Sequence, residues 1–257
     1  MTEHAAHDTT YPSWRTMLAF LIPLMLSNFL QSISSTISSI FLGQFVGVQA
    51  LATVSVFFPV LFLMISFLIG IGNASTVLIG QAYGARNEKQ LKVVVGTSLF
   101  FAFLLGLAVL CIGVIFGRQI FQLMGTPADI FATTLRYATL MFCGLPILFP
   151  YIMYTTFLRG TGDSKTPFYF LIVSTVLTVA LTPWFVLGGL GLPSLGIYGA
   201  GLAFILSDAV TLVLLLIYLD RKKHPLRLDK ETARNLRLNP TILKLLFKIG
   251  IPTGIQM

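Results

Sequence analysis

The feature that most constrains this chain is a span of 70 residues, from Thr16 to Ala85, without a single Asp, Glu, Lys, Arg or His. A membrane-crossing helix needs about 20 consecutive apolar residues, so the span has room for two crossings. Further runs of this kind cover residues 93–117, 137–158 and 166–207, and the last continues past Asp208 to Leu219. The sequence therefore predicts six crossings, over residues 17–43, 50–79, 93–116, 131–157, 167–187 and 197–219.

Composition agrees with this interpretation. Of the 257 residues 56% are hydrophobic and 10% charged, with a mean hydropathy of +0.88, whereas about one quarter of the residues of a soluble domain are charged. The first apolar run follows a polar tail, residues 1–16, and is longer than the apolar core of a signal peptide, so we expect it to be retained. The predicted fold class is an all-α, polytopic membrane protein.

Basic residues predict the orientation of the six helices. Of the 17 Lys and Arg residues, 15 precede the first helix, follow the sixth, or lie between helices two and three or four and five. Only Arg118 and Arg136 lie on the other side. By the positive-inside rule both ends of the six-helix unit are cytoplasmic, which predicts a multi-pass protein of the cytoplasmic (inner) membrane in contact with its lipids. The basic segment 220–241 lacks interleaved aromatic residues, so it indicates a cytoplasmic loop and no nucleic-acid partner.

Residues 242–257 begin another apolar segment. Its Ile251-Pro252 pair resembles Ile22-Pro23 at the start of the first helix, 229 residues earlier and on the same side of the membrane. This spacing is expected of two parallel six-helix repeats. We therefore expect residues 17–219 to form the first lobe of a transporter, 220–241 to be the loop between lobes, 242–257 to be the truncated start of a seventh helix, and a second six-helix lobe to be the partner.

Four motifs resemble the multidrug and toxic compound extrusion (MATE) family. They are IPLMLSNFLQSISSTISSIFLGQFVGVQALA in the first helix, GQAYGARNEKQLK after the second, RGTGDSKTPF before the fifth, and GLGLPSLGIYGAGLAFILSD at the sixth. The resemblance implies an antiporter that exports amphipathic or cationic small molecules, using a proton or sodium gradient and alternating access. Many prokaryotic members carry an Asp at the position of Ser38, and an Asn and an Asp at those of Thr178 and Thr182. None of these is acidic here, so the resemblance supports transport better than cation coupling through this lobe.

Local physics explains two of these motifs without a functional role. In RGTGDSKTPF, Gly160 and Gly162 permit a positive φ in a tight turn, and Arg159 and Lys165 would anchor the loop at the lipid headgroups. In GQAYGAR, Gly84 suits the end of a helix. We interpret both segments as architectural.

Polar groups at membrane depth are the candidates for function, because they are costly in hydrocarbon and usually face a bundle interior or a water-filled cavity. In the first helix, Asn28, Gln31, Ser35 and Ser38 recur at spacings of three and four and share one face. They would either line a cavity or hold neighbouring helices together. In the fifth helix, Thr175, Thr178 and Thr182 form a second stripe, whose hydroxyls would either line the same pocket or bond carbonyls of their own helix.

Asp208 is the one carboxylate expected near the middle of the membrane, where an ionised group costs about 2.5 to 3.5 kcal/mol. It would either exchange a proton during transport or stay protonated and bond a neighbouring helix. Metal ligands and a nucleophile–base pair are lacking at this depth, so we expect neither a cofactor nor an enzyme, and Cys111 and Cys143 have no metal-binding spacing. A channel, a flippase for lipid-linked oligosaccharides and an inactive half-transporter remain as alternatives. The flippase would need basic residues for a diphosphate, for which the sequence offers Arg118 and Arg136.

Overall fold

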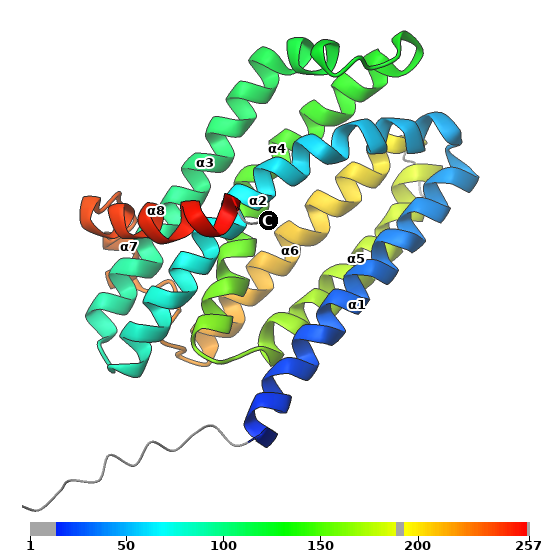
Figure 1. Cartoon of the computed structure of the whole chain (residues 1–257). Coiled ribbons are helices and arrows are strands. Elements are labelled where there is room, and N and C mark those ends of the chain that lie inside the picture. The colour runs from blue at the N-terminus through cyan, green and yellow to red at the C-terminus, as the bar shows by residue number, and fades with distance from the viewer. Residues whose placement is uncertain (1–13, 189–192, 256–257) are drawn as a thin grey trace, which may run out of the picture.

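A computed structural model describes residues 14–188 and 193–255. Six of its helices are long and apolar enough to cross a membrane, as predicted, and the described part of the chain contains no strand. The predicted tail falls largely outside the described residues, as do residues 189–192 of the predicted outer loop and the last two residues. The elements, shown in Figure 1, are α1 (Trp14–Phe45), α2 (Val48–Gly84), α3 (Glu88–Leu123), α4 (Ala128–Gly160), α5 (Lys165–Leu187), α6 (Ile197–Arg221), α7 (Lys230–Arg234) and α8 (Pro240–Ile255).

Several helices extend past the predicted crossings to a turn or a side-chain cap. α3 begins at the cap residue Asn87, whose side-chain oxygen accepts a hydrogen bond of 3.0 Å from the amide of Gln90. Before α5, Asp163 accepts hydrogen bonds from the amides of Lys165 and Thr166 at 3.1 and 3.0 Å and from the Thr166 hydroxyl at 2.6 Å. These contacts satisfy amide groups that have no partner within the helix. α3 and α5 therefore begin where a side-chain cap is available rather than where the apolar run begins.

The loop between α4 and α5 confirms one expected glycine role and corrects another. Gly162 has a φ of 84°, as predicted for the turn. Gly160 instead lies within α4 and has no positive φ; a Cβ there would lie 2.9 Å from the carbonyl oxygen of Thr76 on α2. Gly160 is thus needed for close approach of two helices rather than for a turn.

α4 lies at the centre of the lobe and packs mainly against α2, α3 and α6. α5 packs along α6 on one side and along α1 on the other, so α1 forms one flank of the molecule and α3 the opposite flank (Figure 1). Many large apolar side chains of α1 are exposed, including Met25 and Phe29. An exposed apolar face of this size is suited to contact with lipid or with another protein surface.

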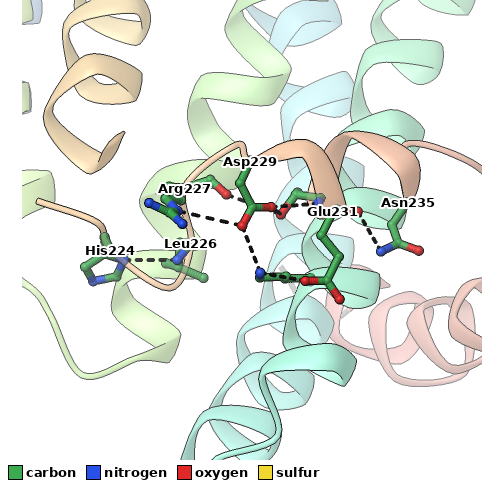
Figure 2. Close-up of polar contacts among 8 residues, drawn as sticks. His224, Leu226, Arg227, Asp229, Glu231 and Asn235 are labelled. Carbon is green, nitrogen blue, oxygen red and sulfur yellow. Dashed lines mark hydrogen bonds and ion pairs between the residues drawn. The ribbon is translucent and has the colours of Figure 1, made fainter. Parts of the chain in front are cut away.

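The segment predicted as a loop between lobes contains the short helix α7, which is held to α3 by ion pairs (Figure 2). Lys92 donates from Nζ to Asp229 Oδ2 and to Glu231 Oε2, both at 2.8 Å. Burial alone would raise the pKa of Asp229, but hydrogen bonds from Lys92 and from the amide and hydroxyl of Thr232 outweigh it and hold that pKa well below its usual range. The loop is therefore attached to the lobe.

α8 contains the predicted start of a seventh helix and lies across α2 and α3 (Figure 1). The Phe247 ring packs edge-on against Phe101 of α3, with ring centroids 5.4 Å apart. Gly250 approaches α2 so closely that a Cβ on it would lie 2.9 Å from the carbonyl oxygen of Gly70. The end of the described chain is thus packed against the first lobe.

Candidate functional site

A cavity of about 490 Å³ lies among α1, α2, α4, α5 and α6. These helices diverge enough to leave space, yet each contributes polar side chains to it. Its lining includes Asn28, Gln31, Ser34, Asn73, Tyr151, Thr155, Thr156, Arg159, Ser174, Thr175, Thr178 and Asp208. Apolar side chains such as Leu148, Leu171 and Phe204 complete the wall. A cavity that combines apolar surface with a few convergent polar groups is suited to bind a small amphipathic molecule.

Asp208 is the carboxylate of this cavity. It lies in the middle of α6, it is buried, and its Oδ1 accepts a hydrogen bond of 2.8 Å from the hydroxyl of Ser174 on α5. The neighbouring hydroxyls of Ser207 and Thr211 are directed elsewhere, because each donates to a carbonyl one turn earlier in α6. The carboxylate therefore links α5 to α6 while facing the cavity. It belongs to no cluster of His, Cys, Asp and Glu that could hold a metal within the described ranges.

The predicted face of α1 divides into two parts. Asn28 and Gln31 line the cavity, and Ser34 lies beside them. Ser35 does not line it, and its hydroxyl donates to the carbonyl of Ser32 at 2.9 Å. Ser38 is half-buried and does not line it either. Along α1 the cavity thus extends from Asn28 to Ser34, and Ser35 and Ser38 lie outside it although they share the same face of the helix.

On α5, polar side chains both line the cavity and bond carbonyls of their own helix. Ser174, Thr175 and Thr178 line the cavity, whereas Thr182 does not. Thr178 also donates to the carbonyl of Ser174 at 2.9 Å, and Thr182 donates to that of Thr178 at 2.6 Å. The threonine hydroxyls are thus bonded within their own helix, so they give the wall polar character at little cost in the membrane.

Sequence reasoning missed several polar groups of the cavity, among them Asn73 and Arg159. Asn73 comes from the C-terminal half of α2, and Arg159 comes from the last turn of α4. We expected Arg159 to anchor a loop at the headgroups, but its side chain lines the cavity. The spacing of Tyr151, Thr155 and Arg159 was the available signal, since residues four apart share one face of a helix.

Arg159 is the basic residue that lines the cavity, in place of the two that the sequence analysis considered. Arg118 and Arg136, the two candidates that the sequence offered for binding a diphosphate, are exposed and lie outside the cavity lining. Arg159 does line it, and its Nε atom is buried without a hydrogen-bond partner in the described structure. The cavity therefore holds one cationic and one anionic side chain. Cys111 and Cys143 are free thiols on exposed faces of α3 and α4, away from this site.

Comparison with known proteins identifies relatives of this lobe. A sequence model of the MatE family matches residues 23–184. The probable multidrug resistance protein YoeA of Bacillus subtilis is 52% identical over 244 residues, which cover 95% of this chain and 53% of the relative. A FAD transporter of Shewanella oneidensis is 28% identical over 203 residues, covering 79% of this chain and 45% of the relative.

A solved structure supports the architecture. It is the outward-facing conformation of a multidrug resistance MATE family transporter, which is 24% identical and superposes with a TM-score of 0.82. The match covers 94% of this chain and 52% of that protein, which shows a shared fold. The chain spans about half the length of the curated relatives it matches.

Proposed function

The chain belongs to the MatE family, and on that premise we propose that it forms the first lobe of a secondary active efflux transporter in the cytoplasmic membrane. Its substrates would be amphipathic or cationic small molecules, including drugs. The name of the Bacillus subtilis relative supports this class of substrate. The role is transport rather than catalysis, in keeping with the family.

The cavity is the observation that carries this proposal. Polar side chains from five helices converge at membrane depth, where each would be costly if it faced lipid. Asn28 and Gln31 are both highly exposed in the lobe, so their amides are free to meet a ligand. A purely structural role for these amides would instead bring them against neighbouring polar groups.

We infer that a second six-helix lobe completes the pathway. The chain matches about half of the curated relatives reported above, and on the α1 wall of the cavity Asn28 and Gln31 are exposed. In our proposal the two lobes rock against each other and expose the cavity alternately to the two sides of the membrane. One lobe alone supplies a single wall of the path, so it would be inactive as a half-transporter.

Coupling to a proton or sodium gradient is assigned to Asp208. Ser38, Thr178 and Thr182 stand where many family members have Asp or Asn, and none of these three hydroxyls exchanges a proton near neutral pH. Asp208 is a carboxylate inside the cavity, with a single hydroxyl bonded to Oδ1. It is therefore the group of this lobe whose charge can change when an ion or a substrate enters.

The test is transport by the full-length protein in liposomes. The cationic dye rhodamine 123 should be moved against its own gradient when a proton or sodium gradient is imposed, and its flux should saturate. Collapse of the gradient should stop the uphill movement. Flux that is only downhill and does not saturate would favour a channel and contradict the proposal.

Arg159 keeps a second candidate function open, the flipping of lipid-linked oligosaccharides. Such a lipid presents a diphosphate, and Arg159 supplies one basic group within the cavity. A diphosphate would be better matched by several cations. Transbilayer movement of a fluorescent polyprenyl-diphosphate sugar by the full-length protein, without export of rhodamine 123, would favour the flippase.

A further inference from the structure

We propose that Arg159 makes the predicted cytoplasmic end of the cavity a binding site for an anionic group, a carboxylate, sulfonate or phosphate, on an amphipathic substrate. This inference rests on the proposed efflux function and names a substrate class for the same cavity. It differs from the expectation of purely cationic substrates, because the site would accept anions and zwitterions.

The state of the Arg159 side chain is the first argument. Its Nε is enclosed by protein and has no hydrogen-bond partner in the described structure, while the side chain lines the cavity. A cation in the last turn of a helix is favoured by the helix dipole. The dipole does not satisfy a desolvated N–H group, however, and a buried donor without a partner is costly. The side chain also lines the cavity, where an oxyanion would give the guanidinium the charged partner that the described residues do not supply.

The absence of a nearby protein carboxylate is the second argument. Asp163 is the acidic residue closest to Arg159 in the sequence, but its oxygens accept hydrogen bonds from the first turn of α5. Asp208 is bonded to Ser174 near the middle of α6. Among the described residues, every salt bridge lies in the cluster around Asp229 and none involves Arg159. Its guanidinium is therefore open to an external anion.

The wall beside Arg159 defines the rest of the ligand. Ile152 and Leu171 give apolar surface, and Thr155 lies one turn before Arg159 on the same helix. Asp208 lines the same cavity from α6 and would suit a cationic group. The arrangement fits a molecule with an apolar body and an anionic end, and it also fits a zwitterion. A planar guanidinium binds such an oxyanion with paired hydrogen bonds, which a lysine could not do equally well.

Two dyes that differ in one group provide the test. Rhodamine 110 has a free carboxylate, and rhodamine 123 is its methyl ester, so only the first presents an anion. Their dissociation constants should be measured by fluorescence polarisation with the full-length protein in maltoside micelles, which contain no phosphate. We expect Arg159→Gln to lower the preference for rhodamine 110 over rhodamine 123 at least tenfold, because a charge-assisted pair is lost.

Two further variants make the result interpretable. Arg159→Lys keeps the charge and should retain a clear part of the preference. Arg118→Gln removes an equivalent charge from an exposed position outside the cavity, and it should leave the preference unchanged. An unchanged preference in Arg159→Gln would overturn the proposal, and so would an equal loss in Arg118→Gln. If Arg159→Gln does not fold, a wild-type protein that binds both dyes equally would overturn it.

The source of the anion is distinguished by repeating the measurement in phosphatidylglycerol nanodiscs. A preference that persists there identifies a substrate anion, whereas a preference present only in micelles shows that a lipid phosphate occupies Arg159. Both results support an anion site. Failure of efflux is a separate outcome, because it would appear as absent uphill transport with the binding preference intact.

Discussion

The close approach of α3 to α4 at Gly106 leads to a prediction about the framework of the cavity. A Cβ at this position would lie 2.8 Å from the Cα of Pro146 and 2.9 Å from the carbonyl oxygen of Leu145. Both are backbone atoms in the middle of α4, so no rotation of a side chain can relieve the clash. Gly106→Ala must push the two helices apart, and α4 carries Tyr151 and Arg159 of the cavity wall.

The matched control is Gly117→Ala in the same helix. There a Cβ would lie 3.3 Å from a methyl carbon of Leu135, which is the end of a flexible side chain. Both substitutions gain the same helix propensity, about 1 kcal/mol, so their difference isolates the clash. Overpacking costs about 1 to 3 kcal/mol. We therefore expect Gly106→Ala to be about 2 kcal/mol less stable than Gly117→Ala.

Thermal denaturation of the full-length protein in maltoside micelles measures this difference. At about 2 to 4 °C per kcal/mol for an unfolding unit of about 200 residues, the size of the six-helix lobe, the two melting temperatures should differ by about 4 to 8 °C. Gly106→Ala should have the lower value. Equal melting temperatures for the two variants would refute the reasoning, because they would show that α3 and α4 do not meet at backbone distance there.

Two further predictions concern the loop and the cavity. Lys92→Met removes both ion pairs to α7, so at pH 7 hydrogen exchange over residues 229–235 should accelerate, whereas Lys89→Met, which changes an exposed lysine, should not accelerate it. The folded state depresses the pKa of Asp229, so its ion pair with Lys92 is present at neutral pH and is lost as the carboxylate is protonated. The difference in exchange rate between wild type and Lys92→Met should therefore persist near neutral pH and shrink below about pH 4. A difference in exchange rate that grows with acid would contradict this. Asn28→Cys should react with a membrane-impermeant maleimide in a protein whose other cysteines, Cys111 and Cys143 included, are replaced by alanine, whereas the parent without Asn28→Cys should not react. Equal labelling of the two would show that Asn28 does not face water.

The six helices could be predicted because a crossing requires a long uncharged run, and the sequence has four such runs, two of which have room for two crossings each. Their ends were less accessible to this reasoning. α3 begins at Glu88 and not at 93, since Asn87 caps a turn that contains charged residues. Lys92 was expected in a loop for the same reason, but it lies in α3 and pairs with α7. Charged residues indicate where a crossing leaves the hydrocarbon core of the membrane, whereas the helix itself continues to the next cap or turn.

The site was predictable only where polarity stood out against an apolar run. Asn28, Gln31, Thr178 and Asp208 meet in one cavity, although nothing in the sequence fixes how α1 rotates against α5. The extent of the cavity along α1 also depends on this packing, since the cavity includes Ser34 but neither Ser35 nor Ser38. Arg159 was missed for another reason, since a cation beside a glycine turn matches the pattern of a headgroup anchor. Only the packing of α4 shows that its side chain is directed into the cavity.

The role of Asp208 is the central claim, and Asp208→Asn tests it most directly. The substitution keeps the size of the side chain, and its amide can still bond the Ser174 hydroxyl, but it removes the titratable group. Export of rhodamine 123 against its gradient should be measured with the full-length protein in liposomes under an imposed proton or sodium gradient. We predict that Asp208→Asn still binds the dye and loses gradient-driven uphill export. Normal uphill export by the variant would contradict the account, because the coupling group would then lie outside this lobe.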